Sequence, residues 1–452
     1  MHGGVVTAGE PRVGGPAGGG LAVGEPVPAS GRRMLVFAVL AFAHILSQFL
    51  RHANAAIAPD IVAEFGLTAA AMGFMTSLFY VMFASAQIPL GSALDRGKPR
   101  YVMAAFMAAS VLGCAFYATA RSFALLAVGR ALMGVGMAVI LMGSMKILSG
   151  WFGSRRFATA SGLLVGISSF GGLLAASPLV SFAGAVGWRT AFWTTGGVIL
   201  AAALLVALLA KDAPLANTAS KDGRAPLAPP LKRGGGHREG YAHVMRSGAF
   251  WRLAPLIFFL AGSLFAVQGL WGGLFVRDVL GVDGTGLGVY LTVMALGVSA
   301  GYLLSGYVAD RFGVARVTLV GASVFVAAHL ALVAATWVPN VPFVFVVYAV
   351  FGFTGSVNVL VLVQAGLAFP SSLTGRAVSG VNMFGIGGAA LVQYGMGAII
   401  ALFPRDALGS YPPAAYRTAF LVVAAGAAAA LAVYLPLAKQ ARRPPARGPT
   451  GS

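Results

Sequence analysis

The hydrophobic positions of the chain form twelve long runs separated by short polar segments. Each run is about 20 residues or longer, enough for an α-helix to cross the hydrocarbon core of a bilayer. The pattern therefore predicts an all-α membrane protein with twelve transmembrane helices. The expected segments are 34–57, 70–90, 101–120, 123–150, 157–183, 190–210, 251–276, 285–308, 315–337, 341–368, 377–403 and 415–438.

The polar segments outside these runs divide the chain into five parts. Residues 1–33 are rich in Gly and Pro and are expected to form a disordered cytoplasmic tail, not a cleaved signal peptide. Residues 211–250 form the one long polar connection, so they are expected to be a cytoplasmic linker. The linker would join an N-terminal half, 34–210, to a C-terminal half, 251–438, which is followed by a cytoplasmic tail, 439–452.

The composition agrees with a membrane protein. Of 452 residues, 58% are hydrophobic and 10% are charged, whereas soluble domains average about 25% charged residues. The single cysteine, Cys114, lies in an apolar run and the six histidines are scattered. We therefore expect no metal site and no cofactor.

The net charge of +19 is distributed unevenly along the chain. Most of the 31 Lys and Arg residues fall in the tails, the linker and the loops on the same side. By the positive-inside rule, both termini and the linker are expected to be cytoplasmic in a multi-pass inner-membrane protein. Contact with the lipid bilayer explains the charge, so no nucleic-acid partner is needed. The opposite loops hold Arg121, Arg189, Arg277, Arg405 and Arg417.

The first apolar run contains a polar stretch, residues 44–54. At about 100° of rotation per residue, His44, Ser47, Gln48 and Arg51 share one helix face. A cation in the hydrocarbon core costs about 2.5–3.5 kcal/mol, so Arg51 needs a compensating environment. Either Arg51 extends to the headgroups near a helix end, or this face lines a polar cavity in a helix bundle.

Three short sequences recur in the same order in the two halves, which indicates a parallel internal repeat. The pairs are Gly91–Arg96 with Gly306–Arg311, Arg156–Gly162 with Arg376–Gly380, and Arg189–Phe192 with Arg417–Phe420.

With these motifs, residues 34–438 resemble the major facilitator superfamily of secondary transporters. The family's loop motif, G-x-x-x-D-R-x-G-x-x-R, is matched by Gly306, Asp310, Arg311, Gly313 and Arg316; the first copy, from Gly91 to Arg100, is one residue shorter. Arg130-x-x-x-Gly134-x-Gly136 matches the family's R-x-x-x-G-x-G. The resemblance implies two six-helix halves and a functional monomer.

The resemblance also implies a cytoplasmic latch between the halves, for which a basic loop that sets topology is the alternative. The candidate gating residues are those of this latch, Gly91, Asp95, Arg96, Gly306, Asp310 and Arg311, together with Arg130 of the fourth segment, which is a structural or gating residue. The fifth segment departs from the G-x-x-x-G-P-x-x-G-G element of drug–proton antiporters. Ile167 replaces the proline, and Gly171-Gly172 comes one residue late. Multidrug antiport is therefore disfavoured.

In the family, the first, fourth, seventh and tenth helices line a central cavity, with contributions from the second, fifth, eighth and eleventh. The polar residues of this chain follow that distribution, although each uncharged one could instead bond neighbouring helices together. The candidate substrate-binding residues are Arg51, His44, Gln48, Tyr80, Gln87, Gln268, Trp271, Asn358, Asn382 and Gln393.

The twelve acidic residues are all expected in tails or loops. Without a membrane carboxylate, His44 or His52 would have to carry a coupled proton, because the unperturbed pKa of histidine is about 6.5. A cavity with Arg51 and no acid favours an anionic solute.

These patterns predict a secondary transporter that moves a small organic anion or related metabolite by alternating access, coupled to a proton or a counter-anion. Arg51 would bind the anionic group, with His44 and Gln48 as hydrogen-bond partners. Efflux of drugs or amphiphiles is the first alternative, and a non-transporting membrane sensor is the second. An enzyme is not expected, since the chain has no Ser/His/Asp arrangement and no nucleotide-binding P-loop.

Overall fold

The computed structural model describes residues 30–152, 154–210, 242–370, 373–406 and 409–440. In these ranges, twelve helical segments are long and apolar enough to cross a membrane, which confirms the predicted number. The first six are formed by α1 Ser30–Phe65, α2 Ala69–Arg96, α3 Pro99–Ala118, α4 Phe123–Met137 with α5 Val139–Trp151, α6 Ser154–Ser168 with α7 Phe170–Leu174 and α8 Ser177–Val186, and α9 Trp188–Leu209. The second six are formed by α12 Gly248–Ala266 with η1 Val267–Trp271 and α13 Gly272–Leu280, α14 Gly284–Phe312, α15 Val314–Ala335, α16 Val341–Gly355 with α17 Asn358–Leu367, α18 Thr374–Ile400, and α19 Pro413–Gln440.

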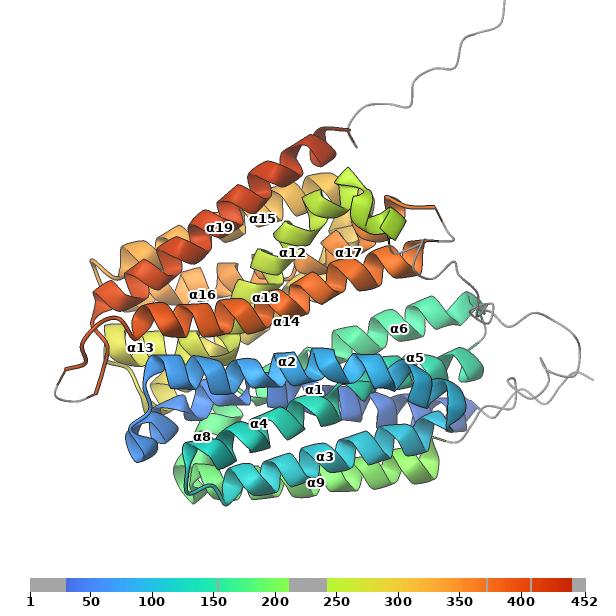
Figure 1. Ribbon diagram of the computed structural model, residues 1–452, viewed down its shortest axis with the longest axis horizontal. Helices are drawn as coiled ribbons and strands as arrows, with labels where there is room; N and C mark the ends of the chain where they lie inside the picture. Colours follow the sequence, from blue (N-terminus) through green and yellow to red (C-terminus); the bar gives the residue numbers. More distant parts are fainter. Residues whose placement is uncertain (1–29, 153, 211–241, 371–372, 407–408, 441–452) are drawn as a thin grey trace, which may run out of the picture.

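The helices form two six-helix halves that lie side by side (Figure 1). The main contacts between the halves are made by α2 along α18 and by α8 along α14. This arrangement confirms the predicted fold class, an all-α membrane protein with two parallel six-helix repeats.

The two ends of the bundle differ, and we name them here. The linker end carries Leu209 and Gly248, between which the chain passes from one half to the other (Figure 1, right). The far end carries Gly66 and Gly281, whose φ angles of 61° and 65° let the chain turn between neighbouring helices.

The repeated sequence Arg-Thr-Ala-Phe has the same structural role in both halves. Arg189 in α9 donates a hydrogen bond to the Ala120 carbonyl over 2.8 Å. Arg417 in α19 donates to the Thr336 hydroxyl over 2.9 Å. In each half, the last helix is thus tied to the connection between the third and fourth membrane helices.

Several helix boundaries differ from the expected ones. α1 begins inside the expected tail 1–33, α12 begins inside the expected linker 211–250, and α19 ends inside the expected tail 439–452. A helix continues as long as its backbone hydrogen bonds are made, so hydrophobicity alone places its ends poorly. Linker residues 242–246 are helical, whereas residues 1–29, 211–241 and 441–452 lie outside the described residues.

The expectation that every acidic residue lies in a tail or loop is wrong for five of them. These residues lie inside helices but close to a helix end, and they are Asp60, Glu64, Asp95, Asp278 and Asp310. Among the described residues, no carboxylate lies in the middle of a membrane-spanning helix.

Besides the fifth membrane helix, which is divided into α6, α7 and α8, two further membrane helices are interrupted in mid-membrane. The fourth membrane helix breaks at Ala138, and the tenth breaks at Ser356 and Val357. A polar side chain bonds to a carbonyl at each break. Gln87 Nε2 donates to the Ala138 carbonyl at 3.3 Å, and Asn358 Nδ2 donates to the Gly355 carbonyl at 3.0 Å. Broken helices persist in membranes when such groups satisfy the freed backbone atoms.

Candidate solute site

Arg51 lies between the two halves, well inside α1. Its guanidinium carbon is 5.1 Å from the centre of the Phe83 ring in α2 and 5.4 Å from the centre of the Phe265 ring in α12. Each half therefore supplies one aromatic face within cation–π range. The ion pairs among the described residues do not include Arg51.

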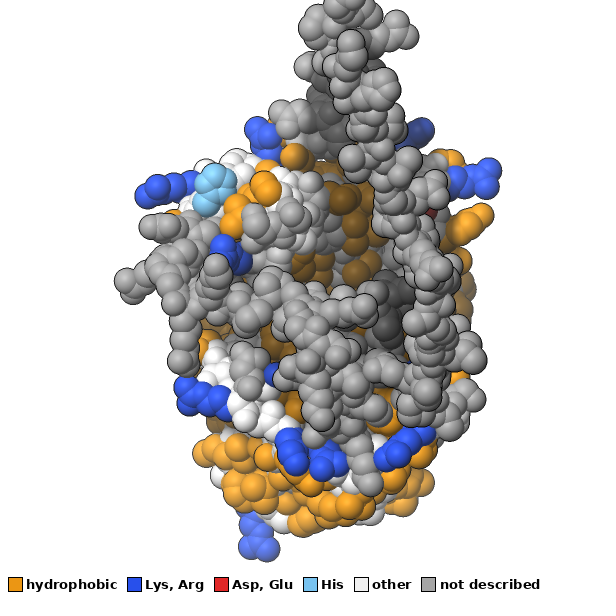
Figure 2. Space-filling view, turned by 90° about the vertical axis from the view of Figure 1, so that its right-hand side faces the viewer, with side chains coloured by type: hydrophobic (Ala, Val, Ile, Leu, Met, Phe, Trp, Pro, Cys, Tyr) orange, Lys and Arg blue, Asp and Glu red, His pale blue; other side chains and the backbone are white. Residues whose placement is uncertain are grey.

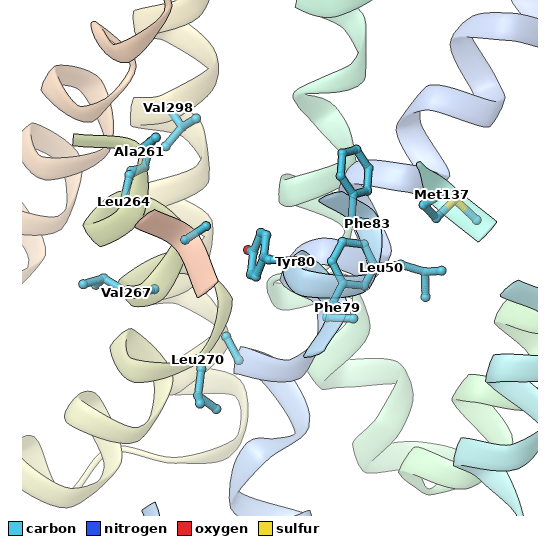
Figure 3. Close-up of a cluster of buried hydrophobic side chains, with 14 of the residues drawn as sticks. Leu50, Phe79, Tyr80, Phe83, Met137, Ala261, Leu264, Val267, Leu270 and Val298 are labelled. Atoms are coloured by element: carbon cyan, nitrogen blue, oxygen red, sulfur yellow. The ribbon is translucent and has the colours of Figure 1, made fainter. Parts of the chain in front are cut away.

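Tyr80 lies between the halves beside this cation. Its ring stacks on the Phe265 ring, with 6.1 Å between the ring centres and 17° between the ring planes. In Figure 3 the Tyr80 side chain extends from α2 toward the segment that carries Leu264 and Val267. The buried hydroxyl has no hydrogen-bond partner among the described residues, so it can bond to a solute that enters here.

The seventh membrane helix changes to a π-helix beside Tyr80, over Val267–Trp271. Such π-bulges often occur at functional sites. Trp271 Nε1 donates a hydrogen bond to the Gln393 carbonyl of α18 over 3.0 Å, and both residues are buried. A Cβ placed on Gly269 would lie 3.6 Å from the Tyr80 hydroxyl and 3.9 Å from Gln393 Oε1. The π-helix thus brings backbone close to both polar groups.

His52 and Gln268 meet at the fifth membrane helix. A Cβ on Gly172 would lie 3.1 Å from Gln268 Nε2 and 3.4 Å from His52 Cδ2. The His52 ring also packs against Phe265, with 6.0 Å between the ring centres. Gly172 is therefore a place where α7, α1 and η1 converge around polar side chains.

Five of these side chains make up what we call the central cluster: Arg51, His52, Tyr80, Gln268 and Gln393. Every member has at least one buried polar atom without a hydrogen-bond partner among the described residues. A buried polar atom without a partner costs about 1–3 kcal/mol, so a polar solute that bonds to these atoms would be stabilised. The unpartnered atoms are Arg51 Nε, His52 Nδ1, Tyr80 Oη, Gln268 Oε1, and Gln393 Oε1 and Nε2.

The remaining candidates are placed differently. His44 and Gln48 lie on α1 and each has an unpartnered buried atom; a Cβ on Gly171 would meet Gln48 Cβ at 2.8 Å. Gln87 and Asn358 are already engaged at the helix breaks. Asn382 is exposed on α18, between the linker end and Gln393.

Arg130 of α4 is fully buried inside the N-terminal half. Its guanidinium donates to the carbonyls of Leu50 and Arg51 over 2.7 and 3.2 Å, and its carbon lies 4.8 Å from the centre of the Phe79 ring. These contacts fix the segment of α1 from which the Arg51 side chain extends.

The other candidate gating residues lie at the linker end. Arg96, Asp310 and Arg311 are exposed, and a Cβ on Gly306 would meet no atom within 4 Å. In this conformation Gly306 therefore does not mediate close helix packing. Gly91 and Asp95 lie in α2, and the side chain of Asp95 is outside the described part of the structure.

The halves touch closely at the far end. Arg405, in the connection between α18 and α19, donates a hydrogen bond to the Leu67 carbonyl, and the Ala69 amide donates to the Tyr411 hydroxyl over 2.9 Å. Asp278 accepts from the Tyr411 amide at 3.2 Å and from the Tyr416 hydroxyl at 2.6 Å. This connection therefore closes over the first turn of α2.

The linker end is open by comparison. Figure 2 shows that this face is hollowed, with hydrophobic side chains inside and Lys and Arg side chains around it. The halves still touch at one place on this side, where a Cβ on Gly166 of α6 would meet the Leu303 side chain of α14 at 3.1 Å. The central cluster thus lies between a closed far end and a hollowed linker end.

Sequence reasoning missed three aromatic residues of the site. Phe83 and Phe265 face Arg51, and Tyr302 accepts a hydrogen bond from Asn358 Nδ2 at 3.2 Å. The spacing of Tyr80 and Phe83 by three residues on α2 could have indicated that both share one face. No comparable signal distinguished Phe265 from the neighbouring phenylalanines.

The chain belongs to the Major Facilitator Superfamily, whose family model matches residues 40–290 and 265–451. It is 27% identical over 303 residues to a D-galactonate transporter from Escherichia coli O6:H1, covering 63% of this chain and 69% of that protein. It is 25% identical over 287 residues to a galacturonate transporter from Dickeya chrysanthemi, covering 62% and 83%. The chain is therefore a multi-pass membrane transporter of small solutes.

A solved structure supports the same fold. The chain is similar to a bacterial homologue of the human lysosomal transporter Spinster, crystallised in an inward-facing and unoccupied conformation. The TM-score is 0.72 at 19% identity, over 92% of this chain and all of that one.

Proposed function

We propose that the protein moves a small organic anion across the inner membrane by alternating access, with Arg51 binding the anionic group. One observation carries this proposal: Arg51 lies between the two halves, flanked by an aromatic ring from each and without a carboxylate partner among the described residues. A desolvated cation in such a site gains most from an anion, which forms charge-assisted hydrogen bonds with it.

The solute we favour is a hydroxylated carboxylate. Its carboxylate would bind Arg51, and its hydroxyl groups would bind the amides of Gln268 and Gln393 and the hydroxyl of Tyr80. The unpartnered atoms of these three side chains support this assignment. The relatives named for D-galactonate and galacturonate support it as well.

In this proposal the linker end faces the cytoplasm, because Lys and Arg surround it. The present conformation would then admit solute from the cytoplasmic side, while the far end is closed. Gly91, Asp95, Arg96, Gly306, Asp310 and Arg311 would form the latch that closes the linker end in the opposite state. Arg130 would hold α1 during the exchange. His44 or His52 would carry a coupled proton, and the protein would function as a monomer.

The test is uptake of labelled D-galactonate by purified protein in liposomes, with and without a pH gradient. Arg51→Gln should abolish uptake and Arg51→Lys should retain a small part of it, because lysine keeps the charge but loses the planar fork. Arg246→Gln removes an exposed linker-end cation and serves as the matched control. Unchanged uptake in Arg51→Gln would contradict the anion site.

The same preparation separates the alternatives. If the wild type transports unrelated amphiphilic cations and none of a panel of carboxylates, the protein is an efflux carrier. If it binds a carboxylate, measured by thermal shift, but never moves it across the bilayer, the sensor alternative is favoured.

A further inference from the structure

The outer surface of the C-terminal half contains an apolar groove between α14, α15 and α16. Its volume is about 950 Å³, and its lining includes Leu296 and Val308 of α14, Val320 and Val324 of α15, and Val350 and Phe353 of α16. The groove lies on the outside of the bundle, where Leu296 and Val320 are 49% and 55% exposed. It is therefore separate from the central cluster and opens toward the lipid.

Close packing beneath the groove explains its shape. A Cβ on Gly297 would lie 2.4 Å from the Ala349 carbonyl oxygen, and one on Gly321 would lie 2.5 Å from Val357 Cγ1. These two glycines let α14 approach α16 and let α15 approach the break after α16, so the tenth membrane helix forms the floor of the groove. Above the floor, the walls consist of small and branched aliphatic side chains that do not fill the space between α14 and α15.

The charge of the groove is confined to one end. Arg316, in the first turn of α15 at the linker end, is the one charged residue of its lining and is exposed. No ion pair of Arg316 occurs within the described ranges. A second cation is close, because the guanidinium carbon of Arg311 lies 5.8 Å from the ring centre of Phe312, which also lines the groove.

Along α15 the length of the groove is close to the thickness of one leaflet, and along α14 its lining continues from Val293 to Phe312, about 29 Å at 1.5 Å per residue. Arg316 and Val324 are eight residues apart on α15, which is about 12 Å at 1.5 Å per residue. Half of a hydrocarbon core of about 30 Å is about 15 Å. A molecule with an anionic head at Arg316 could therefore lay an apolar tail along Val317, Val320 and Val324 within that leaflet.

We propose that this groove is a binding site for a phospholipid with an anionic headgroup, whose phosphate contacts Arg316 and whose acyl chain occupies the groove. Two features together identify the occupant. The apolar lining in mid-membrane excludes a polar solute, and the cation at the headgroup level selects negative charge.

Native mass spectrometry of the full chain in detergent tests the proposal, with added phosphatidylglycerol or phosphatidylcholine as the two probes. The wild type should retain phosphatidylglycerol in preference to phosphatidylcholine. Arg316→Gln should reduce the retained phosphatidylglycerol at least fivefold, and Val320→Trp, which fills the groove, should reduce the retention of both lipids. Arg246→Gln and Val422→Trp are matched controls, since Arg246 is another exposed linker-end cation and Val422 is 53% exposed on α19.

Three outcomes would overturn the proposal. The first is equal phosphatidylglycerol retention in Arg316→Gln and Arg246→Gln. The second is unchanged lipid retention in Val320→Trp. The third is a dimer mass that the wild type shows and Val320→Trp does not. In that case a second copy of the chain, and not a lipid, would occupy the groove. Gel filtration of each variant shows that it is folded before the lipids are compared.

Discussion

The backbone amide of Ala69, at the start of α2, donates a hydrogen bond to the hydroxyl of Tyr411 across the boundary between the two halves, over 2.9 Å. The two residues are 342 positions apart in the sequence. Asp278 orients Tyr411 from the C-terminal half through the Tyr411 amide. This bond can exist only when the far end is closed, so it stabilises that conformation over one in which the halves separate there.

Removal of the Tyr411 hydroxyl should therefore favour opening of the far end. A hydrogen bond contributes about 0.5–1.5 kcal/mol, so Tyr411→Phe should raise the ratio of open to closed molecules about 2- to 10-fold. Spin labels at Arg121 and Val338, in far-end connections of opposite halves, would report this as a longer distance component. Tyr307→Phe, at an exposed tyrosine of α14, should leave the distribution unchanged. If Tyr411→Phe and Tyr307→Phe gave the same distance distribution, the bond from Ala69 to Tyr411 would not stabilise the closed far end.

Adjacent glycines on α18 should respond oppositely to alanine. A Cβ on Gly388 would lie 2.2 Å from the Phe258 carbonyl oxygen, whereas one on Gly387 would meet nothing within 4 Å. Gly388→Ala should destabilise the protein by about 1–3 kcal/mol through overpacking against α12. Gly387→Ala should be neutral or stabilising by up to about 1 kcal/mol, because alanine favours the helix. Thermal unfolding in one detergent measures both, and equal midpoints would contradict the close contact.

Phe265 should affect solute affinity more than its apolar volume alone implies. Its ring contacts the Arg51 guanidinium, the Tyr80 ring and the His52 ring. Phe265→Leu keeps most of the volume but loses the aromatic face, which contributes about 0.5–2 kcal/mol of cation–π attraction. We expect KM for D-galactonate to rise about 2- to 30-fold, with a smaller change in kcat. Phe182→Leu, at an exposed ring of α8, is the control; a KM equal to that of the control would argue against a role for the ring.

Asn358 should contribute to stability through the break in the tenth membrane helix. Its amide donates to the Gly355 carbonyl and to the Tyr302 hydroxyl, at 3.0 and 3.2 Å. Asn358→Leu leaves that carbonyl with one bond fewer, at a cost of about 1–3 kcal/mol. Asn382→Leu, at the exposed asparagine of α18, should cost much less. Calorimetry measures the melting temperature of each variant. Equal melting temperatures would mean that Asn358 does not stabilise the break in the tenth membrane helix.

The sequence alone determined the features that depend on local composition and order. Twelve apolar runs can be read directly, because each membrane helix satisfies its own backbone hydrogen bonds and needs only length and hydrophobicity. The repeated motifs also predicted two parallel halves from the sequence alone, because each motif is a continuous stretch of chain. The face of α1 with His44, Gln48 and Arg51 also follows from helical spacing within one segment.

Only the tertiary structure decided which groups meet between helices. The ring of Phe265 against Arg51, the bonds from Arg130 to the α1 backbone, and the closure of Tyr411 over Ala69 each join residues far apart in the chain. Such contacts depend on the rotation and depth of every helix, which packing fixes jointly and hydrophobic pattern leaves free. Arg51 therefore stood out in the sequence as a costly cation, but the two aromatic faces and the unpartnered amides around it became evident only when both halves were assembled.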